Sequence, residues 1–325
     1  MYTEQVKFWR RCLPVQQQPD YHKLISRFPG IFRENEALAA HSRFKVGGPA
    51  DLFCCPEDIH TLTAIMASAK QADIPVFIMG GGTNLLIRDG GLRGLVLRLG
   101  NGFKYIRTEG RHLIAGCASK LPRACLHAAG QGLTGLESLA GIPGTVGGAI
   151  AMNAGTAEGA ACERLESLTV CEKNGHIHTL KREDFSFGYR NFHWKDGTPV
   201  ENRILLEASW ILDTGDAGLL RHKIRSSLIR RKASQPVDAA SAGCIFKNPL
   251  PDLPAGRLID EAGLKGVQQG GAMVSRRHAN FIVNRGKAQA ADILSLMTWI
   301  QQEIMETHGI ALEREVRIVG ENTPF

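Results

Sequence analysis

The stretch at residues 130–153 most restricts how this chain can fold. It reads Gly-Gln-Gly-Leu-Thr-Gly-Leu-Glu-Ser-Leu-Ala-Gly-Ile-Pro-Gly-Thr-Val-Gly-Gly-Ala-Ile-Ala-Met-Asn. Glycine loses more conformational entropy on folding than any other residue, so its repetition indicates a place where bare backbone is needed. The simplest such need is a large ligand that lies against main-chain N–H groups with no Cβ in the way.

Another glycine loop, earlier in the chain at residues 80–84, follows the apolar run 74–79, which is typical of a buried strand. Both loops carry Thr and Asn side chains that can donate hydrogen bonds beside the glycine backbone. Taken alone, either loop is an ordinary tight turn. Together they predict a polyanionic cofactor held at two places, and a nucleotide diphosphate fits that description.

Two familiar nucleotide motifs explain these loops poorly. Gly130, Gly132 and Gly135 match G-x-G-x-x-G, but that fingerprint requires a preceding strand and a succeeding helix. Here a helix-like segment comes first and Pro143 would interrupt a helix after it, which leaves a dinucleotide fold as a minor alternative. The loop at residues 80–84 lacks the Gly-Lys-Ser/Thr ending of a P-loop.

Composition narrows the class of partner. The net charge of +7 favours acidic partners, nucleic acid among them. The basic residues are scattered, without zinc-finger spacing, so we expect anionic small molecules rather than nucleic acid. The eight cysteines include no Cys-x-x-Cys pair, which argues against a metal site and favours a reducing cytoplasm. No signal peptide or membrane span is predicted, and a monomer is the default expectation.

Periodicity predicts an α+β fold rather than a regular βαβ winding, with few clear helices in the first two thirds of the chain. Residues 1–40 are typical of a helical extension. We expect helices at residues 59–69, 121–128, 219–231 and 291–308. We expect strands at residues 74–79, 95–99, 113–115, 165–171, 177–180, 204–212, 279–284 and 315–319.

Four further segments complete a pattern. They read HSRFKVGGPAD from residue 41, FGYR from residue 187, SAGCIFKNP from residue 241 and EREVRIVG from residue 313. With the glycine loops, they closely resemble the UDP-N-acetylenolpyruvoylglucosamine reductase family, the MurB flavoenzymes of peptidoglycan precursor synthesis. The similarity covers residues 24–320, and the segment lengths resemble the shorter type II form.

The resemblance implies an FAD-binding domain of the PCMH (vanillyl-alcohol-oxidase) type, built from two α+β subdomains, and a C-terminal α+β substrate-binding domain. We place the N-terminal extension at residues 1–23, the FAD-binding domain at 24–215 and the C-terminal domain at 216–325. FAD is expected to bind without a covalent bond. Its expected contacts are Gly80, Gly81, Gly82, Thr83, Asn84, Leu85, Gly141, Gly144, Thr145, Gly147, Gly148, Ala149 and Asn153.

The resemblance also implies the reaction. NADPH reduces FAD and leaves, and UDP-N-acetylglucosamine enolpyruvate then enters the same pocket and becomes UDP-N-acetylmuramate. Hydride passes from flavin N5 to C3 of the enolpyruvyl group, and a proton is added at C2. Such chemistry requires a group that stabilises charge on the pyruvyl carboxylate and a proton donor over C2.

Arg190, Glu315 and Cys244 match the family's catalytic positions. The planar cation of Arg190 suits a carboxylate that becomes an enediolate, and Glu315 is expected to assist it. Cys244 stands where better-known members have serine as the donor to C2. Because an ordinary thiol has a pKa of about 8.5, we expect an alkaline limb in enolpyruvyl reduction. Outside this pattern, the three would be a surface arginine, a salt-bridged carboxylate and a small buried side chain.

Substrate contacts are expected from Tyr189, Lys232, Gln235, Lys247 and Asn248, with Lys232 and Gln235 placed near a phosphate. The basic segment 219–231 is either a solvated helix face or a ligand surface. Two rival functions are weighed against the reductase. One is a flavin oxidase of the same superfamily that uses oxygen, and the other is a nucleotide-binding module without catalysis.

Overall fold

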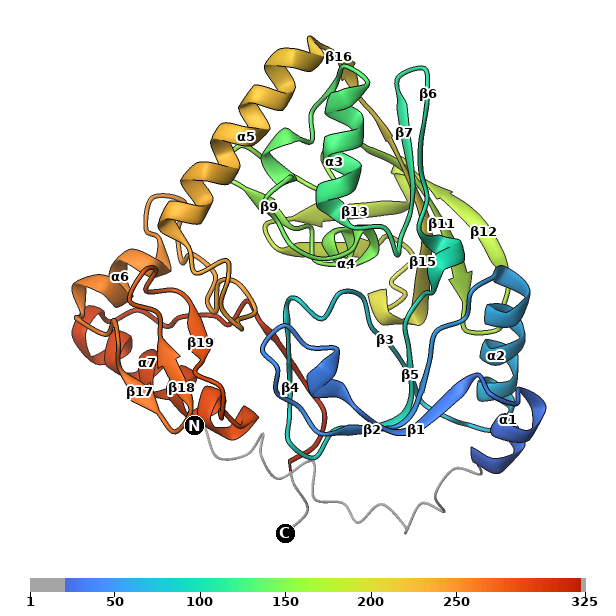
Figure 1. The fold of residues 1–325 in the computed structure, drawn as a ribbon, viewed down its shortest axis with the longest axis horizontal. Helices are drawn as coiled ribbons and strands as arrows, with labels where there is room; N and C mark the ends of the chain where they lie inside the picture. Colours follow the sequence, from blue (N-terminus) through green and yellow to red (C-terminus); the bar gives the residue numbers. More distant parts are fainter. Residues whose placement is uncertain (1–20, 323–325) are drawn as a thin grey trace.

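A computed structural model describes residues 21–322 of the chain. In Figure 1, two strand-containing parts lie one above the other, and the C-terminal segment forms a third part beside them. Helices combined with parallel and antiparallel strands confirm the α+β class. Of the expected N-terminal extension, residues 1–20 lie outside the described residues. No helix within residues 21–322 has the length and apolar character needed to cross a membrane.

The first sheet carries the strand that leads into the first glycine loop. Its strands and covering helices are β1 Phe32–Ala37, β2 Pro49–Cys54, β3 Val76–Ile78, β5 Leu92–Leu97, α1 Tyr21–Arg27 and α2 Ile59–Gln71. In the order β1-β2-β5-β3, β1 is antiparallel to β2, whereas β2 and β3 run parallel to β5. Leu24 of α1 and Leu62 of α2 share a buried cluster with Leu95 of β5, which fixes both helices to the sheet.

The helical extension expected for residues 1–40 is wrong for its C-terminal part. Within the described residues, the helix covers Tyr21–Arg27, and Phe32–Ala37 forms a strand instead. The sequence Phe-Arg-Glu-Asn-Glu-Ala has little strand propensity of its own. Pairing with the more apolar β2 supplies the missing preference, because sheet neighbours often override intrinsic tendency.

The second sheet is antiparallel throughout, in the order β12-β11-β15-β7-β6. Its strands are β6 Ile106–Glu109, β7 His112–Gly116, β11 Leu165–Glu172, β12 Ile177–Lys181 and β15 Arg203–Ile211. Trp210 of β15 is fully buried, and its indole N–H donates to Ala161 O at 2.7 Å. A buried indole with a satisfied donor anchors this strand to the loop after the second glycine-rich stretch.

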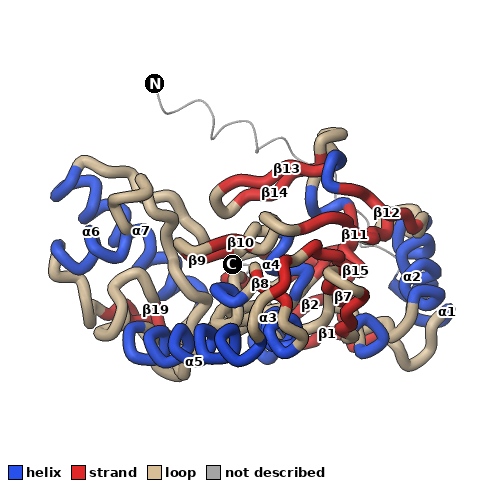
Figure 2. Tube along the Cα trace, turned by 90° about the horizontal axis from the view of Figure 1, so that it is seen from above, coloured by secondary structure: helices blue, strands red, loops and turns tan. Residues whose placement is uncertain are grey.

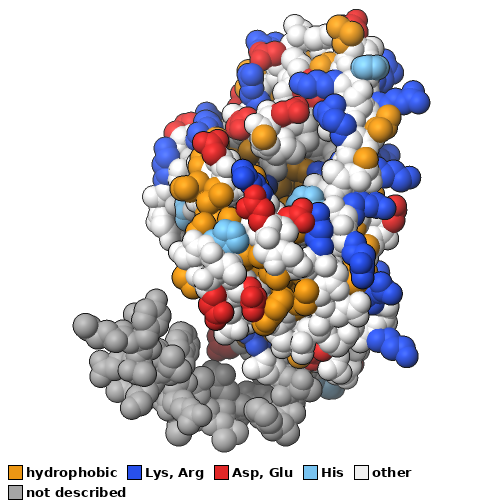
Figure 3. Space-filling model, turned by 90° about the vertical axis from the view of Figure 1, so that its left-hand side faces the viewer, with side chains coloured by type: hydrophobic (Ala, Val, Ile, Leu, Met, Phe, Trp, Pro, Cys, Tyr) orange, Lys and Arg blue, Asp and Glu red, His pale blue; other side chains and the backbone are white. Residues whose placement is uncertain are grey.

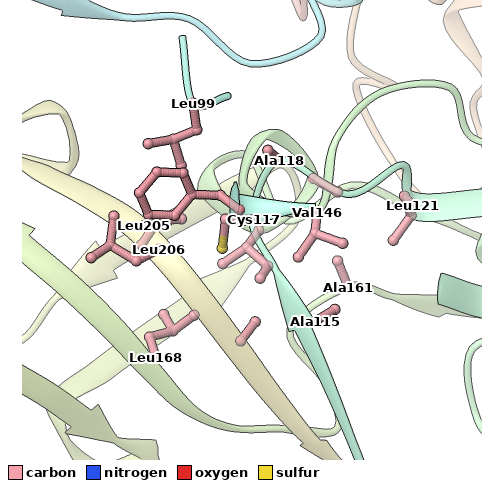
Figure 4. Close-up of a cluster of buried hydrophobic side chains, with 14 of the residues drawn as sticks. Leu99, Ala115, Cys117, Ala118, Leu121, Val146, Ala161, Leu168, Leu205 and Leu206 are labelled. Atoms are coloured by element: carbon pink, nitrogen blue, oxygen red, sulfur yellow. The ribbon is translucent and has the colours of Figure 1, made fainter. Parts of the chain in front are cut away.

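Two helices belong to the surroundings of the glycine-rich stretch. α3 Leu121–Gly130 ends where the stretch begins, and α4 Val146–Ala151 lies within it. Figure 4 shows Leu121 of α3 and Val146 of α4 in the same apolar cluster as Leu168, Leu205 and Leu206 of the sheet. The glycine-rich stretch is therefore held on one side by a packed core. Short pairs complete this part, β8 Leu133–Thr134 with β16 Asp213–Thr214, and β9 Gly155–Thr156 with β10 Gly159–Ala160.

The C-terminal part has its own core. Its elements are α6 Ala255–Glu261, β17 Gln268–Gln269, β18 Ala272–Val274, β19 Ile282–Asn284 and α7 Ala290–His308. Ile293, Met297 and Ile300 of α7 lie in the core at helical spacing. The predicted stop is confirmed, because Gly309 takes a left-handed φ of 67° and caps the helix through a bond to Met305 O.

The three parts are interlocked. The last strand, β20 Arg317–Val319, returns to pair in parallel with β4 Leu85–Ile87, directly after the first glycine loop. Helix α5, Ala217–Ser234, runs along one side from the second part towards the C-terminal part (Figure 2). Leu220 and Ile224 of α5 belong to the large core of the first two parts, whereas Phe44 belongs to the C-terminal core. The division of the chain at residue 216 therefore stays a prediction.

Buried thiols predict a loss of stability in alkali. Burial raises the pKa of Cys171 to about 11 and those of Cys125 and Cys162 to about 12, and it also raises the pKa values of Cys54 and Cys117. Unfolding exposes thiols that ionise near pH 8.5, so their contribution is complete below that pH and falls as pH rises. Between pH 8.5 and 9.5 the free energy of unfolding should drop by about 1 kcal/mol per thiol.

Urea unfolding under reducing conditions at pH 7.5, 8.5 and 9.5 measures this drop. A Cys125→Ala variant serves as the control. It removes one of the seven described thiols whose pKa is raised, Cys55 and Cys244 included, and should flatten the alkaline slope by about one seventh. Stability that stays constant from pH 7.5 to 9.5 would contradict the prediction.

Candidate active site between two glycine loops

The two glycine loops, far apart in sequence, lie against each other. A Cβ added at Gly80 would come within 2.8 Å of Thr145 Oγ1, and one at Gly81 within 3.1 Å of Gly144 Cα. A side chain at these positions would press on the Thr145 hydroxyl and on the Gly144 backbone, so glycine suits this close approach. This contact brings together the two stretches that the sequence singled out.

Two cavities open on either side of this contact. The reaction cavity, about 390 Å³, contains Gly82, Leu85, Ala149, Arg190 and Glu315 among its lining residues. The inner cavity, about 280 Å³, is lined by parts of β3 and β15, by Cys117 and Ala118 directly after β7, and by Gly147. Both are lined by Gly80, Gly81, Thr145 and Gly148. Cavities that share a strip of bare backbone fit an elongated dinucleotide with a central diphosphate.

Polar side chains of the loops mainly fix the loops themselves. Thr145 caps α4 by accepting a hydrogen bond from Gly148 N at 3.3 Å. Thr83 Oγ1 donates to Pro143 O at 3.3 Å, which ties one loop to the other. Asn84 Nδ2 donates to Glu315 O at 3.1 Å. The surfaces left for a ligand are therefore backbone and glycine Cα atoms.

Arg190 is positioned by a tight hairpin. The strands β13 Phe185–Gly188 and β14 Asn191–Trp194 pair so that Tyr189 and Arg190 form the turn, and Arg190 has a left-handed φ of 54°. Such a φ is uncommon outside glycine and marks a conformation that its surroundings must hold. Arg190 Nε donates to Glu315 Oε1 at 2.8 Å, and Nη2 donates to Gly155 O at 2.9 Å.

Cys244 and Glu315 are brought together by main-chain pairing. Glu315 N donates to Ile245 O at 2.7 Å, and an isolated bridge joins the next residue, Phe246, to the segment before Glu315. Buried Asn280 holds the cysteine-bearing segment, since its Oδ1 accepts from Phe246 N and its Nδ2 donates to Phe246 O. The thiol and the carboxylate are thus fixed on adjacent extended segments.

Burial decides the charge state of the thiol. It raises the pKa of Cys244 to about 12, with Glu315 acting in the same direction and Arg190 and Arg231 opposing. Burial also raises the pKa of Glu315 above its usual range, against the lowering effect of Arg190. A neutral thiol is the state that can donate a proton, so the environment suits that task.

Several sequence-predicted residues line neither of these two cavities. They are Gly141, Asn153, Tyr189, Lys232, Gln235, Cys244 and Asn248. Asn153 is 4% exposed, donates to Gly188 O at 2.8 Å and accepts from Cys162 N, so it braces the base of the Arg190 hairpin. Gly141 faces Arg231, whose Cδ would lie 2.9 Å from an added Cβ.

Of the residues predicted to contact the substrate, only Lys247 lines the reaction cavity, and the others lie outside it. Lys247 lines the reaction cavity and forms an ion pair with Glu313. Tyr189 is 54% exposed, and its hydroxyl accepts from Asn248 N at 3.2 Å. On α5, Lys232 is exposed and offers its carbonyl oxygen to Arg277 Nη1. The main-chain carbonyl oxygen of Gln235 also accepts a hydrogen bond from Arg277 Nη1. The side-chain Oε1 of Gln235 is buried and has no hydrogen-bond partner among the described residues.

Arg231 was missed by the sequence reasoning. Lys and Arg side chains follow the right-hand edge of the face in Figure 3, where α5 lies, and most of them are exposed. Arg231 differs, because burial lowers its pKa. The charges of Arg43 and Arg190 lower this pKa further, whereas Cys244 raises it. No ion pair of Arg231 occurs in the described part of the chain. The sequence of α5 is basic along its whole length, so it does not distinguish Arg231 from the exposed cations of the same helix.

Comparisons with known proteins agree with this geometry. A family model described as the C-terminal domain of UDP-N-acetylenolpyruvoylglucosamine reductase matches residues 235–319, and an FAD binding domain matches residues 50–181. The reductase of Geotalea uraniireducens is 45% identical over 92% of this chain and 97% of its own length. That of Heliobacterium modesticaldum is 40% identical over 91% and 93%.

The crystal structure of the reductase from Thermus caldophilus superposes with a TM-score of 0.77 at 36% identity, covering 89% of this chain and 100% of that one. These matches confirm the expected fold, a PCMH-type FAD-binding region and then a C-terminal domain of the reductase type. The chain belongs to the UDP-N-acetylenolpyruvoylglucosamine reductase family of FAD-dependent oxidoreductases.

Proposed function

We propose that this protein uses NADPH to reduce the enolpyruvyl group of UDP-N-acetylglucosamine enolpyruvate, giving UDP-N-acetylmuramate. The observation that carries the proposal is the Arg190–Glu315 ion pair in the wall of the reaction cavity, 2.8 Å between Nε and Oε1, with Cys244 on the segment beside it. Membership in the reductase family supports the substrate.

FAD, when bound, supplies the hydride for C3 of the enolpyruvyl group. The residues proposed to hold it are the backbones of Gly80, Gly81, Gly144 and Gly148, which form the strip shared by or adjoining both cavities. Thr83, Thr145 and Asn84 keep that strip in shape. The division of the chain at residue 216 is proposed to separate this cofactor region from the substrate domain.

Arg190 is proposed to bind the pyruvyl carboxylate. Its Nε and Nη2 are already occupied by Glu315 and Gly155, which fixes the guanidinium plane. A fixed cation stabilises the charge that develops on the carboxylate as C3 accepts hydride, because no reorganisation is needed at that moment. Glu315 acts on the substrate through Arg190 by holding its orientation.

Cys244 is proposed to hold the proton that C2 receives. A thiol with a pKa of about 12 stays protonated throughout the working pH range. The alkaline limb expected for an ordinary thiol is thereby moved out of that range. Arg231, close enough to influence the Cys244 thiol, is a further candidate for contact with an anionic group of the substrate.

Tyr189, Lys247 and Asn248 are proposed to contact the sugar nucleotide, with Lys232 and Gln235 at its phosphates. Lys247 has the best support, since it lines the reaction cavity. We further propose that the protein acts as a monomer in the cytoplasm.

Anaerobic half-reactions test the proposed function. The purified protein should show an oxidised flavin spectrum that NADPH bleaches. The enolpyruvyl nucleotide should then restore the spectrum faster than air does. Rapid reoxidation by oxygen together with inertness to the enolpyruvyl nucleotide would support an oxidase of the same superfamily instead. A protein without bound flavin would favour a nucleotide-binding module.

Replacing Cys244 by alanine should separate the two half-reactions. Bleaching by NADPH should stay within about twofold, because hydride transfer from NADPH to the flavin requires no proton from Cys244. Reoxidation by the enolpyruvyl nucleotide should slow by about 100-fold or more, the usual contribution of a positioned proton donor. Stopped-flow absorbance of the flavin measures both rates.

Cys244→Ser is the matched control, since a hydroxyl keeps the proton. The rate of flavin reoxidation by the enolpyruvyl nucleotide should depend on pH in the same way in the wild type and in this variant between pH 7 and 10. Neither should lose rate through ionisation of a thiol in that range. A wild-type limb near pH 8.5 that is absent in Cys244→Ser would show that the thiol ionises in the working range. Loss of flavin bleaching in Cys244→Ala would indicate a structural role.

Gly81→Ala should weaken FAD binding. The added Cβ would lie 3.1 Å from Gly144 Cα, so the two loops must separate. We expect the FAD dissociation constant to rise about tenfold, measured by the recovery of flavin fluorescence on dilution. Gly130→Ala is the control, because nothing lies within 4 Å of its added Cβ. Equal FAD affinity in the two variants would contradict the cradle.

A further inference from the structure

A third cavity, the basic cavity, lies beside the reaction cavity and has no role in the steps described above. It measures about 620 Å³ and is lined by five cationic side chains, Arg43, Lys45, Arg98, Lys120 and Arg123. No Asp or Glu is among its lining residues. Gathering five cations without an anion is unfavourable unless an anionic ligand offsets their repulsion.

The cations of the basic cavity are unpaired. None of the five forms an ion pair within residues 21–322; Arg43 Nη2 instead donates to Val237 O at 2.5 Å. Arg98 Nη1 donates to His41 Nδ1 at 3.3 Å, while His41 Nε2 lies 2.7 Å from Glu36 Oε1. Glu36 thus fixes Arg98 through the imidazole and leaves the guanidinium charge unneutralised.

Two further observations point to a ligand. Ser42 lines the basic cavity and is 2% exposed, and its hydroxyl has no hydrogen-bond partner among the described residues. Buried hydroxyls are normally satisfied, so an orphan one marks a missing acceptor or donor. Lys45 has a left-handed φ of 59°, a strained conformation that is typical of functional sites when the surroundings maintain it.

The basic cavity adjoins the site of hydride transfer. It shares Gly81, Thr83, Pro143 and Gly144 with the reaction cavity. Arg98 and Lys120 also line the inner cavity, whereas Arg43, Lys45 and Arg123 line the basic cavity alone. A dinucleotide with one end in the reaction cavity can therefore extend its far end towards these last three cations.

We propose that the basic cavity binds the adenosine 2′-phosphate of NADPH and so makes the enzyme prefer NADPH over NADH. The inference rests on the proposed function, because it assigns a place to the reductant of that reaction. NADPH and NADH both carry a diphosphate. NADPH differs only by its 2′-phosphate monoester, which has about two negative charges. The cations exclusive to this cavity supply the complementary charge, and Ser42 supplies a hydroxyl partner.

The test uses oxidised holoenzyme and two exposed cavity residues. The double variant Lys45→Asn/Arg123→Gln removes two charges, and Asn tolerates the left-handed φ of position 45. Calorimetric titration should show NADP⁺ binding weakened about tenfold or more, with NAD⁺ binding changed less than twofold. The salt dependence of NADP⁺ binding should also become shallower.

Arg221→Gln, an exposed cation on α5 outside the basic cavity, is the matched control and should leave both ligands unaffected. Equal weakening of NADP⁺ and NAD⁺, or no change in either, would overturn the inference. Loss of flavin absorbance from the double variant would assign the cavity to FAD instead, and weakened binding of the UDP-sugar with unchanged NADP⁺ would assign it to the substrate. None of these results would contradict the proposed function. The proposed function fails only if NADPH does not bleach the flavin of the wild-type protein.

Discussion

The close approach of two glycine loops is the constraint on which the rest of the structure depends. Gly80 and Gly81 can meet Thr145 and Gly144 only because no side chain intervenes. The loops come from different parts, one at the edge of the first sheet and one packed on the second. Their contact joins the two sheets, and the residues that form it line both the reaction cavity and the inner cavity.

The return of the chain to the first part completes the site. Pairing of β20 with β4 brings Glu315 next to Asn84, the last residue of the first glycine loop. The same segment pairs with the cysteine-bearing segment through Glu315 N and Ile245 O. The C-terminal part therefore cannot shift without moving Glu315, the partner that orients Arg190. The C-terminal part and the first part are coupled through this short stretch of backbone.

Local chemistry made much of this predictable. Repeated glycine marked the two loops that meet, and helical spacing with a terminal Gly309 placed the start of α7 within one residue. Residues whose role depends on distant partners were harder. Asn153 braces the Arg190 hairpin, a role that the sequence did not indicate, and its expected contact with FAD stays a prediction. A strand replaced the helix expected over residues 32–37. Arg231 gave no signal, since its importance arises from which way one turn of a basic helix faces.

A cysteine in place of serine changes what the surroundings must do. An alcohol stays protonated in water at any physiological pH, whereas an exposed thiol ionises near pH 8.5 and then has no proton to give. Two arginines near Cys244 would promote that ionisation, but burial and Glu315 oppose it and prevail. Glu315 therefore has two effects, because the carboxylate that aligns Arg190 also disfavours a second negative charge on sulfur. One buried anion thus keeps the cation in place and the thiol protonated.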